Sequence, residues 1–271
     1  MEKPDAMINI KLPLYSLLLS VLSLNSIAGQ QNRYSTSNTI GWYNSFATFQ
    51  LTDRLGLHTE YQWRRNHLIT DWQQSLLRVG LNIQMNPRVL ARFGYAWIET
   101  YPYGEIPLNS MGRDFTEHRI YEMLQLSHKE NRVDISHRFM LEQRFLGKYS
   151  SPGLEEEDQF PLLNRMRYMV RFRFQPGGSF PEKLYGVLYD EIFIGFGKNV
   201  GANIFDQNRL GLMIGFQAGK NLRLEGGYLS QIVQYGRIID GKNVFQYNSG
   251  LIINALFQMD LRKNNFSDRE R

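Results

Sequence analysis

The sequence predicts an all-β protein, an up-and-down antiparallel β-barrel that crosses a membrane, and three observations lead to that prediction. Segments in which apolar and polar residues alternate recur along the chain, and no helical period is sustained after residue 28. Most segments are long enough for a tilted strand to cross a bilayer, which takes about 9–11 residues. Tight turns alternate with longer polar connections between the segments, as they do in membrane barrels.

The first 28 residues are expected to be a signal peptide that is removed on export. Leu12 to Leu24 is an uncharged, leucine-rich run that follows two lysines and leads into Ser26-Ile27-Ala28, a plausible cleavage site. A short buried helix or a membrane anchor is the alternative interpretation of this run. No other stretch approaches the roughly 18 apolar residues of a spanning helix, which argues against a helical membrane protein.

The expected strands follow one another through the rest of the chain. The clearest is 165–174, where Arg165 and Arg167 lie on one face of the strand and Met166 and Tyr168 on the other. Counting every such segment gives 11 strands, at 41–51, 55–64, 77–84, 88–99, 117–128, 133–145, 165–174, 184–196, 209–217, 222–228 and 247–259.

The connections between these strands are predicted to sort by length into the two ends of the barrel. Short periplasmic turns are expected at 52–54, 85–87, 128–132 and 219–221, with an intermediate one at 175–183. Longer outer loops are expected at 65–71, 101–116, 146–163, 197–206 and 233–243.

The number of strands is expected to be even. With an odd number of consecutive antiparallel strands, the first and the last run in the same direction, so antiparallel closure needs one more strand. Only residues 31–40 leave room for it. We therefore expect 10 to 12 strands and favour 12.

The apolar faces can point inward, as in a soluble ligand-binding barrel, or outward to lipid. The soluble alternative requires a second domain, because the chain is longer than an eight-stranded barrel needs, and no linker marks one. The outward arrangement places Tyr61, Trp63, Tyr95 and Trp97 at the long-loop end, where membrane barrels carry an aromatic girdle. We expect a barrel domain at 41–261 in the cell outer membrane, after a segment at 29–40 and before a polar tail at 262–271.

Composition excludes several other classes of protein. The chain has no cysteine, which excludes disulfides, thiolate metal sites and a lipoprotein anchor. The formal net charge of +5 is modest and its lysines and arginines are spread along the chain, so no nucleic-acid partner is expected. The partners expected are outer-membrane lipid and an anionic small solute, while the sequence identifies neither a protein partner nor an oligomeric state.

Four blocks of residues resemble a family catalogued as domain of unknown function number 2490. These blocks are 136–145 (SHRFMLEQRF), 165–168 (RMRY), 189–193 (YDEIF) and 205–210 (FDQNRL). Met140 departs from the family pattern, in which an arginine is usual. The resemblance implies a Gram-negative outer-membrane-type barrel and no established activity.

The inward faces are predicted to carry more arginines than carboxylates. The arginines are Arg64, Arg78, Arg92, Arg119, Arg138, Arg144, Arg165, Arg167, Arg171, Arg173, Arg209 and Arg223. The carboxylates are Glu60, Glu117, Asp134, Glu142, Glu225 and one of Asp190 and Glu191. Because guanidinium groups bind carboxylate and phosphate, a pore or site for anions is one hypothesis. A structural network that fills the barrel is the other.

The candidate ligand-binding residues are therefore Arg138, Glu142, Arg144, Arg165, Arg167, Arg171, Arg173 and Arg209. Most of them come from the two expected strands 133–145 and 165–174. The role that fits this pattern best is passive, as a pore, a ligand conduit or a scaffold.

Enzymatic activity is not favoured by the sequence. A lipid-modifying barrel is the alternative, because His137 has the parity of the lipid-facing row, but no Gly-x-Ser-x-Gly motif is present and Ser136 points to the opposite face. No catalytic residue, metal ligand set or cofactor motif is identified. The five histidines are scattered without metal-binding spacing.

Overall fold

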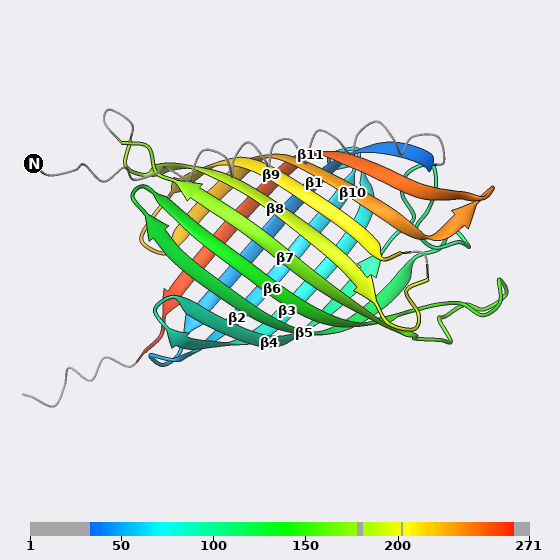
Figure 1. Ribbon diagram of the computed structural model, residues 1–271, viewed down its shortest axis with the longest axis horizontal. Helices are drawn as coiled ribbons and strands as arrows, with labels where there is room; N and C mark the ends of the chain where they lie inside the picture. Colours follow the sequence, from blue (N-terminus) through cyan, green and yellow to red (C-terminus); the bar gives the residue numbers. More distant parts are fainter. Residues whose placement is uncertain (1–32, 178–180, 202, 263–271) are drawn as a thin grey trace, which may run out of the picture.

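The computed structural model describes residues 33–177, 181–201 and 203–262, which form one closed β-barrel (Figure 1). These residues contain 11 strands: β1 (Arg33–Gln50), β2 (Leu55–Asn66), β3 (Asp71–Asn86), β4 (Val89–Thr100), β5 (Phe115–Glu130), β6 (Val133–Leu146), β7 (Leu162–Phe174), β8 (Leu184–Phe196), β9 (Phe205–Gln217), β10 (Leu222–Ile239) and β11 (Lys242–Asp260). Consecutive strands pair antiparallel, which confirms the up-and-down meander. Within the described part of the chain, no helix is long and apolar enough to span a membrane. The signal-peptide prediction at 1–28 lies outside the described residues.

The barrel closes through a parallel pair, where we expected an additional strand. β1 pairs with β11 along its whole length, from Arg33 opposite Asn243 to Gln50 opposite Asp260. Residues 33–40 belong to β1 and do not form a separate strand. The favoured number of 12 is therefore wrong, because it assumed antiparallel closure. A parallel ladder also satisfies the backbone groups of both edges, so 11 strands leave no open edge.

Turns and loops lie at opposite ends of the barrel, as predicted, but two predicted loops are shorter than expected. Only residues 67–70 separate β2 from β3. The region 233–243 is a long hairpin of β10 and β11 that extends beyond the neighbouring strands (Figure 1). Its turn is Asp240-Gly241, with φ of 49° and 73°. Positive φ at both turn residues suits a tight hairpin, and Asp-Gly favours that turn.

The side chains alternate across the sheet as the sequence predicts, with apolar residues outside and charged residues inside. On β7, Arg165 and Arg167 are 3% and 6% exposed, whereas Met166, between them, is 56% exposed. On β9, Leu210, Leu212 and Ile214 form an exposed apolar row. This arrangement is the opposite of a soluble barrel that encloses an apolar cavity.

Aromatic side chains gather on the outer surface near the loop end. Trp63 packs against Tyr43 and Trp72, with ring centroids 5.3 and 6.2 Å apart, and Trp72 packs against Tyr101 at 5.2 Å. The guanidinium of Arg65 lies 4.4 Å from the Trp72 ring. Tyr61, Tyr95 and Trp97 are also exposed on the outer surface, as the girdle prediction requires.

Two glycines on the inner face make room for a buried tyrosine. Gly80 on β3 is paired with Gly94 on β4, and Tyr121 from β5 is fully buried against both. A Cβ atom at Gly80 would lie 2.5 Å from the Tyr121 hydroxyl, and one at Gly94 would lie 2.6 Å from it. The close approach of Tyr121 therefore depends on glycine at both positions.

We predict that Gly80→Ala lowers the free energy of unfolding by about 1–3 kcal/mol, the usual cost of overpacking. Tyr121→Phe, which removes the nearest clashing atom, should recover part of the loss. Urea unfolding of the barrel in detergent measures both effects. Gly153→Ala is the control, because nothing lies within 4 Å of its added Cβ. Equal effects of the Gly80 and Gly153 substitutions would contradict this explanation.

Candidate functional site

The interior of the barrel contains two cavities that share five lining residues. The cavity nearer the loops has a volume of about 440 Å³, and the cavity nearer the turns about 550 Å³. Both are lined by Trp42, Gln62, Arg78, Arg167 and Arg209, which therefore form the junction between them. All twelve arginines predicted to face inward line one cavity or both.

Glu142 is the centre of a buried network of charged side chains between β5, β6 and β7. Its carboxylate is 0% exposed and accepts hydrogen bonds from Arg119 (3.0 Å), Arg165 (2.8 Å) and Arg167 (2.7 Å). Each arginine also reaches a second carboxylate, so the pairing is mutual. Charge-assisted hydrogen bonds of this kind are the strongest available inside a protein.

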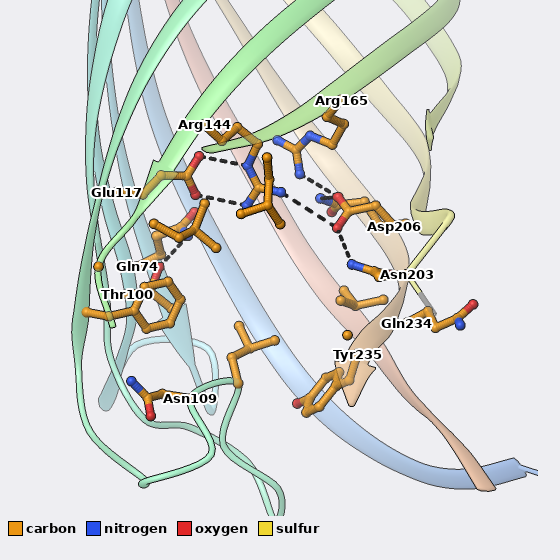
Figure 2. A pocket seen from close by; sticks show the side chains of 18 of the residues that line it. Gln74, Thr100, Asn109, Glu117, Arg144, Arg165, Asn203, Asp206, Gln234 and Tyr235 are labelled. Carbon is orange, nitrogen blue, oxygen red and sulfur yellow. Dashed lines mark hydrogen bonds and ion pairs between the residues drawn. The ribbon is translucent and has the colours of Figure 1, made fainter. Parts of the chain in front are cut away.

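The network continues toward the loop-side cavity through Glu117, Arg144 and Asp206 (Figure 2). Glu117 accepts hydrogen bonds from the Nε atoms of Arg119 and Arg144, both at 2.8 Å. Asp206 is hydrogen-bonded to Arg165 and lies 3.8 Å from Arg144. Arg144 and Arg165 therefore face the cavity with their positive charges largely balanced.

Toward the turns, Glu191 is the carboxylate that several arginines share. It accepts hydrogen bonds from Arg138 (2.8 Å) and Arg167 (2.7 Å), and Arg209 approaches it to 3.7 Å. Of the two carboxylates that the sequence left open, Glu191 is therefore the inward one. Asp190 is exposed on the outer surface.

The remaining predicted site residues form separate pairs near the turns. Arg171 pairs with Glu225, which also accepts a hydrogen bond from the Tyr185 hydroxyl at 3.2 Å. Arg173 pairs with Asp134 at 2.8 Å. The structure thus brings Arg138, Glu142, Arg144, Arg165, Arg167 and Arg209 into one network and leaves Arg171 and Arg173 beside it.

Arg64 lines the loop-side cavity beside the junction and forms no ion pair with a carboxylate among the described residues. Its guanidinium donates hydrogen bonds to Gln62 (2.8 Å) and to Gln74, and it lies 3.9 Å from the Trp42 ring. Arg209 lies 4.8 Å from the same ring. Two cations therefore flank Trp42, which lines both cavities, and of the two Arg209 has a carboxylate oxygen, from Glu191, within 4 Å.

The loop at 101–114 crosses the mouth of the barrel. It leaves β4 and returns to β5, yet it contacts β10 and β11, which lie four or five strands away around the sheet. The Tyr103 hydroxyl donates to Gln246 at 2.7 Å, and the Tyr235 hydroxyl donates to the Ile106 carbonyl at 2.7 Å. Burial raises the pKa of the Tyr103 phenol, so it remains a donor at neutral pH.

Several residues that shape the interior were not identified from the sequence. Asp206 fell in a predicted loop, and Trp42 was not assigned to a face. Register shifts beside Phe193 place both Asp206 and Gln207 inside, so simple alternation could not assign them. The Asp-Gly pair at 240–241 was the one available signal for the β10–β11 hairpin.

Among the described residues, no serine is hydrogen-bonded to His137, the residue on which the enzymatic alternative rests. The ring faces outward, contacts the Tyr168 hydroxyl at 2.9 Å and stacks on His128, with centroids 5.9 Å apart. Ser136 and Ser127 line the turn-side cavity on the other face of the sheet. Within the described ranges, no three His, Cys, Asp or Glu side chains are grouped to bind a metal ion.

The fold and the interior define the class of the protein: a closed β-barrel with an apolar exterior and an arginine-rich interior. A family model described as "Protein of unknown function (DUF2490)" matches residues 39–239. The chain therefore belongs to that family, which confirms the resemblance found in the sequence.

Two further comparisons complete these findings. No curated protein matches the chain. Among solved structures, it is similar to one titled "NanC porin structure in rhombohedral crystal form", with a TM-score of 0.41 and 10% sequence identity, over 75% of this chain and 91% of that chain.

We predict that Glu142→Gln destabilises the barrel by about 3–5 kcal/mol, because it leaves three buried guanidinium groups short of one counter-charge. The loss of stability is measured by thermal unfolding, with gel mobility used to monitor the folded barrel. Asp134→Asn is the matched control, since Asp134 and its partner Arg173 are both about one-third exposed. A Glu142 variant as stable as the Asp134 variant would contradict the central role of the network.

Proposed function

We propose that the protein is an outer-membrane β-barrel whose interior conducts or binds small anions. The observation that carries the anion proposal is the pair of arginines on Trp42, beside the junction of the two cavities, of which Arg64 has no ion pair with a carboxylate among the described residues. A cation held without a counter-charge in a confined space attracts anions and repels cations.

Location in the membrane is supported by the exterior of the barrel. A closed barrel pairs its backbone groups between strands, which allows it to be surrounded by lipid. Exposed apolar side chains continue around the sheet, for example Leu81, Phe93 and Leu212, and aromatic rings gather near the loops. The long loops would then face the outside of the cell and the short turns the periplasm.

A scaffold role is the second candidate, and the network around Glu142 favours it. Arg119, Arg165 and Arg167 donate hydrogen bonds to carboxylates of their own and of other strands. Side chains that saturate one another in this way rigidify a barrel and attract no solute. The loop at 101–114 adds to this by occupying part of the mouth.

The membrane proposal predicts that the exported protein sediments with outer membranes and resists extraction by carbonate. It also predicts faster gel mobility of the unheated protein, because a folded barrel stays compact in detergent. Fractionation of a Gram-negative host, with gels of heated and unheated samples, tests both. Recovery in the soluble periplasmic fraction would overturn the proposal.

The anion proposal predicts conductance in planar bilayers with a preference for chloride over potassium. Arg64→Gln should move that preference toward the value of a neutral pore, because it removes a cation that has no ion pair with a carboxylate among the described residues. The double variant Arg167→Gln, Arg171→Gln tests the arginines with carboxylate partners, and should lower the unfolding temperature more than Arg64→Gln does. A stable wild-type barrel without conductance would favour the scaffold role.

A further inference from the structure

Three arginines that line the turn-side cavity, Arg78, Arg92 and Arg138, donate fewer hydrogen bonds than Arg119 and Arg167 do. Arg78 donates one to Glu60 (2.6 Å), Arg92 one to Asn82 (2.6 Å) and Arg138 one to Glu191 (2.8 Å). By contrast, Arg119 and Arg167 each donate three, all to carboxylates. Since a guanidinium group carries five N–H donors, most of the donors in the first group have no protein acceptor among the described residues.

Some of these donors are buried, which makes the shortage costly. The Nε atoms of Arg78 and Arg138 are shielded from solvent and have no hydrogen-bond partner. Nε2 of His58 is also shielded, and a Glu60 carboxylate oxygen lies 3.6 Å from it. Arg78 is 5% exposed overall. A buried donor without an acceptor costs free energy that a bound acceptor would recover.

The three guanidinium groups also carry an excess of positive charge. Glu60 is the carboxylate that pairs with Arg78, and Arg92 takes part in no ion pair among the described residues. Glu191 pairs with Arg138 but is shared with Arg167 and Arg209. These three guanidinium groups therefore face one carboxylate of their own, Glu60, and a share of Glu191, so that positive charge exceeds negative charge here.

Arg78 and Arg92 are held in place by the residues behind them. Arg92 and Arg78 approach the buried ring of Tyr121, with the Arg78 guanidinium 5.1 Å from the ring centroid. Tyr121 in turn fills the space left by Gly80 and Gly94. Arg78 and Arg92 therefore sit on a packed support formed by β3, β4 and β5, and Arg138 on β6 lines the same cavity of about 550 Å³.

We propose that Arg78, Arg92 and Arg138 bind a phosphate group in the turn-side cavity. Phosphate supplies negative charge and several acceptor oxygens, which matches the excess of positive charge and the unused donors. The group belongs to free inorganic phosphate or to a small phosphate ester, since these arginines face the lumen and not the lipid. The proposal requires an accessible interior, as the proposed function does, but it does not require conduction.

Isothermal titration of the folded barrel in detergent with inorganic phosphate tests the site, with chloride keeping the ionic strength constant. We expect saturable binding of one phosphate per barrel. The affinity should fall about tenfold or more in Arg92→Gln and in Arg138→Gln, because each loses charged hydrogen bonds. Arg92→Lys, which keeps the charge but loses the planar fork, should bind with intermediate affinity.

Arg54→Gln is the control, since Arg54 lines the same cavity from the turn between β1 and β2 and is not among the candidate ligand-binding residues. Its phosphate affinity should equal that of the wild type. Heat-modifiable mobility of each variant shows that the barrel is folded before titration. The same titration is made with glycerol phosphate and with succinate. Tighter binding of glycerol phosphate than of inorganic phosphate identifies an ester as the ligand. Tighter binding of inorganic phosphate than of glycerol phosphate identifies the free ion.

Three results would overturn the site: no saturable phosphate binding by the wild type, equal binding of succinate, or unchanged affinity in both the Arg92→Gln and Arg138→Gln variants. Each is independent of conductance. A barrel that conducts anions but does not bind phosphate would therefore refute the site alone, and one that binds phosphate but does not conduct would refute only conduction.

Discussion

The burial of Glu142 among three guanidinium groups is the constraint on which the interior of the barrel depends. Taking these charges out of water is costly, and only complete mutual pairing offsets the cost. Pairing in turn requires β5, β6 and β7 in one register, with Glu142 opposite Arg165 and next to Tyr121. A shift by one residue would turn the arginines of β7 toward the outer surface. The network therefore fixes the strand register as well as filling the lumen.

Much of this arrangement follows from the period of two in the sequence. The face on which a side chain lies follows from alternation along its own strand and does not depend on the neighbouring strands. Arg165, Arg167 and Arg209 could therefore be assigned to the interior directly. Adjacent carboxylates such as Asp190 and Glu191 could not be separated, because one of them had to face outward and only the register of β8 decides which. The family resemblance added the outer-membrane expectation and no activity.

The features that sequence reasoning missed all depend on contacts between distant parts of the chain. Parallel closure joins Arg33 to Asn243, and no local pattern marks that pairing. The loop at 101–114 reads as an ordinary polar connection, yet its Ile106 is buried against β10 and β11 on the far side of the mouth. Asp206 enters the lumen because of a register shift beside Phe193. Local alternation cannot report any of these.

The number of acceptors within reach separates the arginines that support the barrel from those available to a ligand. Arg167 and Arg92 lie on the same inner surface, but Arg167 finds Glu142 and Glu191 on the strands next to its own, while Arg92 finds the amide of Asn82. The charge of Arg167 is therefore neutralised by carboxylates of the fold, whereas the charge of Arg92 is not. Arg64 in the loop-side cavity and Arg92 in the turn-side cavity are thus two arginines that the fold leaves without an ion pair among the described residues, and an uncompensated cation in a confined space attracts anions.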